Sequence, residues 1–311
     1  MTKDISVLFI IFNRPDFTKN VFEAIRKAKP QKLFIAADGP RDNKAGEEEL
    51  CNETRKIATM VDWPCEVRTL FRERNLGCGK AVSGAISWFF ENVEEGIILE
   101  DDCLPDVSFF SFCKELLEKY RDSQNIFMIS GGNYLPKHLL PGGSYHFSRV
   151  PHIWGWATWR RAWKKYDFEM TDFPSFSKNY EIKNIWSDKN TQEYFMERFK
   201  EVYKGQLDTW DYQWNYCIWK NNGISISPNY NLISNIGFGS GTHTLNKDDP
   251  SASIPLEKMK FPLITDSISV YEYGDEYENR QLLQKKSILK TILKRLGLFE
   301  IARRFYLYIK Y

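Results

Sequence analysis

The sequence lacks any apolar run long enough to cross a membrane. Its first apolar run, 5–12, follows the polar residues Thr2, Lys3 and Asp4. A membrane-spanning helix needs about 20 apolar residues, and a secretory signal needs a cleavage site after its apolar region. We therefore expect a cytoplasmic protein, with peripheral attachment to the inner face of the membrane as one option.

A strong net charge and paired cysteine motifs are also missing. The chain has 43 Lys and Arg residues against 41 Asp and Glu residues, so its net charge is only +2. This balance argues against nucleic acid as a partner. The six cysteines show no CxxC spacing, and we expect them to be reduced packing residues.

Aromatic residues are abundant instead. Phe, Trp and Tyr make up 15% of the 311 residues, and 10 of them are Trp. Aromatic rings can form platforms for sugar or base faces, and the alternative is a large aromatic core.

Short apolar runs alternate with helical patterns in the first half of the chain. Phe17, Val21 and Ile25, for example, lie four apart on one face of a predicted helix. This alternation predicts an α/β fold with a mainly parallel sheet and helices on both faces. The expected strands are 5–12, 32–37, 66–71, 96–99 and 126–130, and the expected helices are 16–29, 47–60, 79–92 and 108–121.

The pattern changes along the chain. We treat 1–270 as one domain with two halves, 1–135 and 136–270, because no low-complexity linker divides it. The segment 271–311 is expected to form a basic amphipathic helical tail that suits an anionic membrane surface. The alternative is a helix packed on the domain. The basic residues of this tail are Lys285, Lys286, Lys290, Lys294, Arg295, Arg303, Arg304 and Lys310.

Polar residues follow three of the predicted strands. Glu100, Asp101 and Asp102 come directly after the apolar run 96–99, and Arg14 and Asp38 come after the first and second strands. Ligands of parallel α/β sheets bind outside the carboxyl ends of the strands. Carboxylates at such an edge need a positive partner, and oxygen ligands suit Mn²⁺ or Mg²⁺ better than zinc. The alternative is a solvated acidic turn.

Several motifs, in this order, resemble the GT-A glycosyltransferases, in particular N-acetylglucosaminyltransferase I and bacterial sugar-nucleotide transferases built like it. They are 8–15, 34–40 and 97–102, the last followed by 104–105 and 109–110, and the similarity runs from about residue 6 to about residue 244. Cys103 stands where the family has an apolar residue after its acidic triplet. The resemblance implies a GT-A fold, with the nucleotide in the first half of the domain and the acceptor and catalysis in the second.

The resemblance also implies roles for the polar edge. Asp102 is the expected direct ligand of Mn²⁺ or Mg²⁺, and Asp101 and Glu100 are expected to hold ribose or metal-bound water. Asp38 is expected to accept a hydrogen bond from the base, and Arg14 to face the base or diphosphate. Because a carboxylate can read uracil N3–H, which cytosine lacks, the expected donor is a UDP-sugar. The alternatives are a turn-forming Asp38, and Arg14 as a surface charge or a partner of Asp38.

Three further segments, 75–80, 152–159 and 235–243, resemble segments of the family, and in the family the second lines the donor-sugar and acceptor pocket. Residues 75–80 precede a predicted helix, so their N–H groups and Lys80 could approach the nucleotide, although such glycine-rich helix entrances are common. Trp156 could stack on a sugar face, whereas Trp159 and Trp163, four apart on a predicted helix, are expected in the core. The glycine-rich loop 235–243 resembles one that closes over a diphosphate, and His243 is either a ligand contact or a plain loop residue.

The segment 209–212 resembles the family's Trp-Asp-Asp segment, which carries the catalytic base. Tyr212 stands where a second Asp is expected, so Asp211 is the first candidate and Asp208 the second.

The expected activity is metal-dependent transfer from a UDP-sugar to a glycan or lipid-linked saccharide, with inversion. One alternative is a sugar-1-phosphate nucleotidyltransferase, which is expected to carry a Gly-rich basic loop in place of 13–15. The other is a non-catalytic glycan-binding protein that uses the Trp cluster, which leaves the acidic triplet unexplained.

Overall fold

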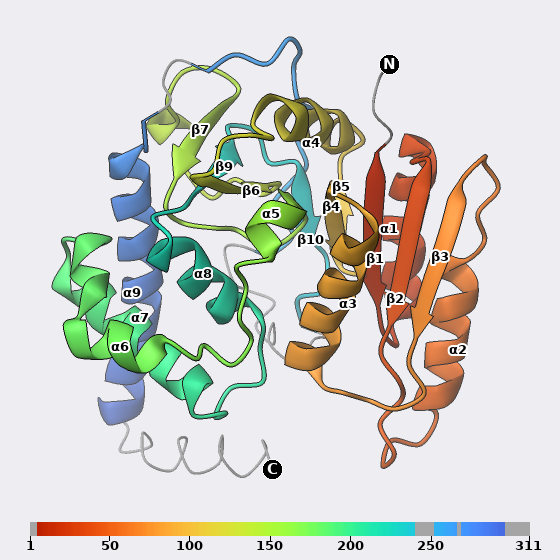
Figure 1. The fold of residues 1–311 in the computed structure, drawn as a ribbon, viewed down its shortest axis with the longest axis horizontal. Coiled ribbons are helices and arrows are strands. Elements are labelled where there is room, and N and C mark those ends of the chain that lie inside the picture. Colours follow the sequence, from red (N-terminus) through yellow and green to blue (C-terminus); the bar gives the residue numbers. More distant parts are fainter. Residues whose placement is uncertain (1–4, 240–251, 266–268, 296–311) are drawn as a thin grey trace.

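One mixed sheet of eight strands runs through the molecule (Figure 1). The structure is a computed structural model that describes residues 5–239, 252–265 and 269–295, the last twelve without their side chains. Across the sheet the strand order is β3-β2-β1-β4-β8-β6-β9-β7. The strands are β1 Ser6–Ile11, β2 Lys32–Ala37, β3 Glu66–Phe71, β4 Glu95–Glu100, β6 Ile126–Ser130, β7 Tyr145–Ser148, β8 Trp156–Trp159 and β9 Ile224–Pro228; β5 Cys103–Pro105 and β10 Ile233–Asn235 form a separate pair.

The first four strands of the sheet, β3, β2, β1 and β4, are all parallel to one another. Strand β8 then lies antiparallel between β4 and β6. The α/β fold with a mainly parallel sheet is therefore confirmed, and all five predicted strands are present. The sequence patterns did not predict β8, and its last residue, Trp159, was expected on a helix.

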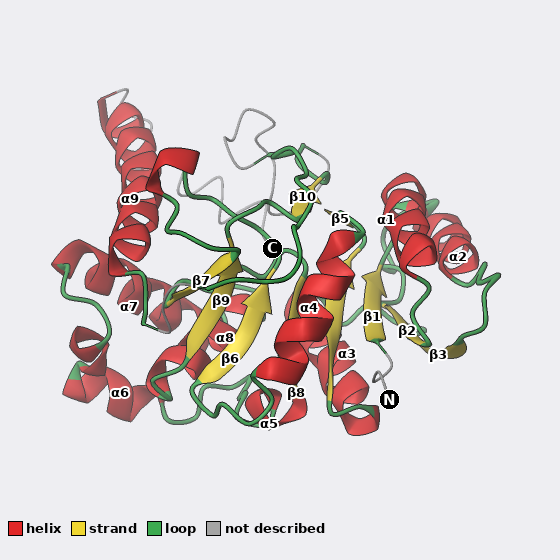
Figure 2. Cartoon of the chain, turned by 90° about the horizontal axis from the view of Figure 1, so that it is seen from above, coloured by secondary structure: helices red, strands yellow, loops and turns green. Residues whose placement is uncertain are grey.

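Helices cover both faces of the sheet (Figure 2). Alternate residues of β1 divide between two cores: Val7 and Phe9 pack with α1, α2 and α4, whereas Leu8 and Ile10 pack with α3 and α8. The helices are α1 Pro15–Ala28, α2 Glu47–Ala58, α3 Cys78–Asn92, α4 Ser108–Lys119, α5 Arg160–Trp163, α6 Phe173–Asn179, α7 Lys189–Tyr203, α8 Asp211–Lys220 and α9 Glu272–Arg295.

Trp159 and Trp163 are buried, as expected, at 1% and 5% exposure. They do not share a helix, however, because Trp159 ends strand β8 and Trp163 ends helix α5. The predicted helical spacing is therefore wrong, while the predicted core packing is confirmed.

The boundary expected at residue 270 falls just before α9, whose first turns pack on the domain. Asp275 is only 3% exposed and accepts hydrogen bonds from the Ser148 hydroxyl at 2.6 Å and the Arg149 N–H at 2.9 Å. Glu278 contacts His152 at 2.8 Å. This half of α9 is thus part of the folded body, and the basic residues of the expected tail lie beyond the described side chains. In the part of the chain that the structure describes, no helix is both long and apolar enough to cross a membrane.

Arg161 ties α5 to the connection between α4 and β6. Its guanidinium donates to the carbonyl oxygens of Tyr120 at 3.0 Å, Arg121 at 2.7 Å and Ile126 at 2.9 Å. It also lies over the ring of Trp159, 4.4 Å from the ring centre. These contacts fix the end of β8, the strand that pairs with β4.

Replacing Arg161 with Met should lower the free energy of unfolding by about 2–4 kcal/mol, because three carbonyl groups lose a charged donor. Urea unfolding at pH 7 measures the change. Arg26→Met is the control, since its pair with Asp62 is exposed and such pairs contribute little. Equal stability of Arg161→Met and the wild type would contradict the prediction.

Candidate functional site

The carboxyl ends of β1, β2 and β4 bring the polar residues of three separate segments to one edge. Ile10 of β1 pairs with Glu100 of β4, so the residues that follow each strand lie side by side. The turn from β1 to α1 consists of residues 12–14 only, and it includes Arg14. This is the edge at which parallel α/β sheets bind ligands.

Arg14 holds two of the three acidic residues. Its guanidinium makes a two-atom ion pair with Asp101, and its Nη1 donates to Asp102 Oδ2 at 2.9 Å. The Phe12 N–H also donates to Asp101, at 3.4 Å, and the Phe17 ring lies 5.6 Å from the guanidinium carbon. The alternative that Arg14 pairs with Asp38 is therefore wrong. The expected contact of Arg14 with base or diphosphate stays a prediction.

The acidic edge is formed by Glu100, Asp101 and Asp102. Burial and mutual repulsion shift the pKa values of its carboxyl groups. Burial, followed by the charges of Asp102 and Asp101, raises the pKa of Glu100 to about 8. Burial also raises the pKa of Asp101 to about 6, although Arg14 opposes this shift. For Arg14 itself, burial lowers the pKa, but the two carboxylates outweigh it and the net shift is upward. Burial and the neighbouring carboxylates therefore favour the protonated form of Glu100, whereas Asp101 and Asp102 favour the charged form of Arg14.

In this arrangement the acidic edge does not fit a divalent metal ion. Such an ion takes several oxygen ligands, and the facing oxygens of Asp101 and Asp102 are bound to Arg14. Among the side chains of residues 5–239, 252–265 and 269–283, no three of Asp, Glu, His or Cys converge on a point where they could hold an ion. The predicted metal role of Asp102 and Asp101 would require Arg14 to move.

Asp38 is buried at the end of β2 and is bound by backbone N–H groups. Its carboxylate accepts from Gly39 at 3.0 Å and from Leu76 at 3.1 and 3.0 Å. Burial raises its pKa, and these hydrogen bonds oppose the shift. Asp38 therefore joins β2 to the loop before α3, as well as being the candidate reader of a base.

The loop before α3 directs its N–H groups to side chains of the protein. The Leu76 N–H donates to Asp38, and the N–H groups of Cys78 and Gly79 both donate to Asp208 at 2.9 Å. The N–H groups of residues 75–80 were expected to approach a nucleotide. Those of Leu76, Cys78 and Gly79 instead bind the protein's own carboxylates. Lys80 is exposed on the first turn of α3.

Asp208 caps α3 from 130 residues away in the sequence. Each of its two carboxylate oxygens accepts one N–H group of the first turn. The N-cap residue of α3 is Gly77, which has no side chain that could accept these hydrogen bonds. This use of both oxygens makes Asp208 a structural cap and a poor candidate for the catalytic base.

Asp211 begins α8 and has a different environment. Within the described part of the chain, its hydrogen bonds all fall on Oδ1, which accepts from the Thr209 hydroxyl and from the Tyr212 N–H at 2.8 Å. Its charge contributes to the raised pKa of Glu100 and of the partly buried Cys78 thiol. Asp211 therefore lies close to the acidic edge with Oδ2 available.

Trp156 is fully buried, and the prediction that it stacks on a sugar is wrong for this arrangement. It has 0% exposure in β8, and its ring stacks on Trp210, with centres 5.7 Å apart and a 16° angle between planes. The Tyr166 hydroxyl donates to the Trp210 carbonyl at 3.1 Å. These aromatic contacts position the residue directly before Asp211, so the Trp cluster is a support for the candidate base.

Among the tryptophans of the segment 152–159, Trp154 is partly exposed, and the sequence analysis missed it. Its ring lies 5.5 Å from that of Phe238 and 5.9 Å from that of Tyr134. The neighbouring Gly237 passes so close to Asp102 that a Cβ atom there would lie 2.4 Å from Oδ2. The start of the loop 235–243 thus lies against Asp102. Its closure over a diphosphate stays a prediction, and His243 lies outside the described residues. Strand alternation offered no signal for this difference, because Trp154 precedes β8 and Gly155, at φ 62°, interrupts the extended backbone between Trp154 and Trp156.

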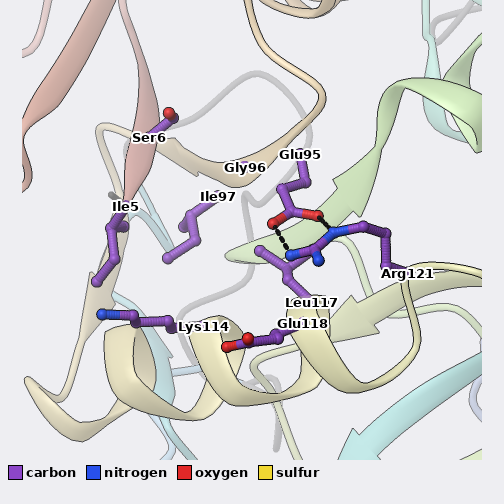
Figure 3. A pocket seen from close by; sticks show the side chains of 9 residues that line it. All are labelled: Ile5, Ser6, Glu95, Gly96, Ile97, Lys114, Leu117, Glu118 and Arg121. Carbon is purple, nitrogen blue, oxygen red and sulfur yellow. Dashed lines mark hydrogen bonds and ion pairs between the residues drawn. The ribbon is translucent and has the colours of Figure 1, made fainter. Parts of the chain in front are cut away.

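A small pocket lies at the amino ends of β1 and β4, opposite the carboxyl ends that form the candidate site (Figure 3). Ile5 and Gly96, at the starts of β1 and β4, line it together with Lys114 of α4. The ion pair between Arg121 and Glu95, 2.7 Å long, borders it. None of the candidate site residues lines this pocket, so it is separate from the acidic edge.

No protein-family model matches the sequence, and no curated protein matches it either. Among solved structures, TarS 1-349 from S. aureus has 8% identity and a TM-score of 0.34, over 53% of this chain and 50% of that chain. HddC from Yersinia pseudotuberculosis has 11% identity and a TM-score of 0.34, over 55% and 87%. A UDP-glucose pyrophosphorylase complexed with UDP-glucose has 11% identity and a TM-score of 0.30, over 52% and 79%. Similarities this weak carry no functional argument, and the fold class follows from the sheet topology.

Replacing Asp208 with Ala should lower the free energy of unfolding by about 0.5–2 kcal/mol, the usual cost of losing a helix cap. Asp208→Asn should lie closer to the wild type, because its amide oxygen still accepts one N–H group. Urea unfolding of the three proteins tests this order. An Ala variant as stable as the wild type would show that the cap contributes nothing.

Proposed function

We propose that this protein is an inverting glycosyltransferase. It moves a sugar from a UDP-sugar to a hydroxyl group of a glycan or lipid-linked saccharide. The single observation that carries the proposal is the position of Asp211. In the part of the chain that the structure describes, no hydrogen bond is made to Asp211 Oδ2, and this carboxylate lies near an acidic sheet edge that also holds the cation Arg14.

In the proposed reaction, Asp211 Oδ2 takes the proton of the acceptor hydroxyl. The acceptor oxygen then attacks the anomeric carbon, and the bond from that carbon to the diphosphate oxygen breaks. The nucleoside diphosphate leaves with the bonding electron pair. A general base of this kind typically contributes about 10²–10⁴-fold to the rate.

Several partners remain proposals. Asp38 would read uracil through Oδ2, which accepts from the Leu76 N–H at 3.0 Å, whereas Oδ1 accepts from both Gly39 and Leu76. A Mn²⁺ or Mg²⁺ ion at Asp102 depends on the departure of Arg14. An anionic membrane surface is the proposed partner of the basic segment that ends the chain.

Two observations disfavour the alternative functions. The turn from β1 to α1, residues 12–14, is too short to contain the Gly-rich basic loop expected of a nucleotidyltransferase. The Trp cluster around Trp156 and Trp214 is buried, so it offers no platform for a glycan-binding protein.

The test is incubation of the full-length protein with UDP-, CDP- and GDP-linked sugars, with the release of nucleoside diphosphate followed by chromatography. We expect slow release of UDP from one UDP-sugar, because water replaces the acceptor. Asp211→Asn should reduce this release by about 10²–10⁴-fold, and Asp208→Asn should leave it near the wild-type rate.

Calorimetry with UDP serves as the control, since Asp211→Asn should bind UDP as the wild type does. Inactivity of Asp208→Asn, with an active Asp211→Asn, would transfer the base role to Asp208. Formation of a nucleotide sugar from a sugar 1-phosphate would replace the proposal with the nucleotidyltransferase.

A further inference from the structure

Arg14 is placed as a built-in cation of the acidic edge. It leaves the short turn after β1 and reaches across to the residues that follow β4. Its side chain is 24% exposed, whereas those of Asp101 and Asp102 are 3% and 13% exposed. The pairing is therefore partly shielded from water, where ion pairs are screened less than on the surface.

The oxygens that Arg14 occupies are those that a metal ion would need. Nη1 contacts Asp102 Oδ2 at 2.9 Å, and Nη2 and Nε contact both oxygens of Asp101. A divalent ion bound to the same oxygens would lie within a few ångströms of the guanidinium, and two cations so close repel each other strongly. Because its planar guanidinium can bind a carboxylate through two nitrogens, an arginine competes with a metal ion for these oxygens more strongly than a lysine would.

We propose that Arg14 competes with divalent cations for Asp101 and Asp102, so that a metal ion binds this edge only when Arg14 leaves it. The inference does not depend on the proposed glycosyltransferase activity, because it concerns the free protein and a metal ion alone.

The experiment is titration of the full-length protein with Mn²⁺, with the free ion measured by electron paramagnetic resonance at pH 7. Arg14→Gln should bind Mn²⁺ about tenfold or more tightly than the wild type, because it frees two adjacent carboxylates. Adding Asp102→Asn to Arg14→Gln should remove the gain.

Arg121→Gln is the matched control. Arg121 pairs with Glu95, the first residue of β4, at the opposite end of the strand that leads to the acidic triplet (Figure 3). This variant frees one carboxylate far from the site, and its Mn²⁺ affinity should equal that of the wild type.

An affinity of Arg14→Gln that equals or falls below the wild-type affinity would overturn the proposal. A gain that persists after Asp102→Asn would also overturn it, because the ion would then bind elsewhere. If Arg14→Gln does not fold, Arg14→Lys gives the same test, since a lysine cannot hold both carboxylates as a planar fork. Its Mn²⁺ affinity should exceed that of the wild type, and an unchanged affinity would refute the competition.

Discussion

The ion pairs of Arg14 with Asp101 and Asp102 organise the candidate site. Two adjacent carboxylates at the end of a buried strand repel each other, and their burial is costly unless a positive group pairs with them. Arg14 supplies that group from the turn between β1 and α1. The same contact joins the ends of two parallel strands and sets the net charge of the edge.

A second constraint brings the other half of the chain to this edge. Asp208 binds the first turn of α3, and the stacked rings of Trp156 and Trp210 hold the next residues in place. As a result, Asp211 lies near Glu100 although the two are 111 residues apart in the sequence. Asp208 and Asp211, which look alike in the sequence, therefore have different roles.

The sequence predicted the parallel half of the fold well because its signals are local. The apolar runs and helical spacings of residues 5–130 depend on neighbours within a few turns. The meeting of Arg14 with the acidic triplet at one edge then follows from the parallel sheet. Three features depended on distant packing and could not be read from local patterns: strand β8, the cap formed by Asp208, and the choice of Asp101 and Asp102 as the partners of Arg14.

A double-mutant cycle between Arg14 and Asp101 tests the central pairing most directly. The free energy of unfolding is measured for the wild type, Arg14→Gln, Asp101→Asn and the double variant. We expect the two changes to be non-additive, with a coupling energy of about 1–3 kcal/mol, because contacting charged groups couple on this scale. Additive effects, with a coupling energy near zero, would show that Arg14 does not stabilise the acidic edge.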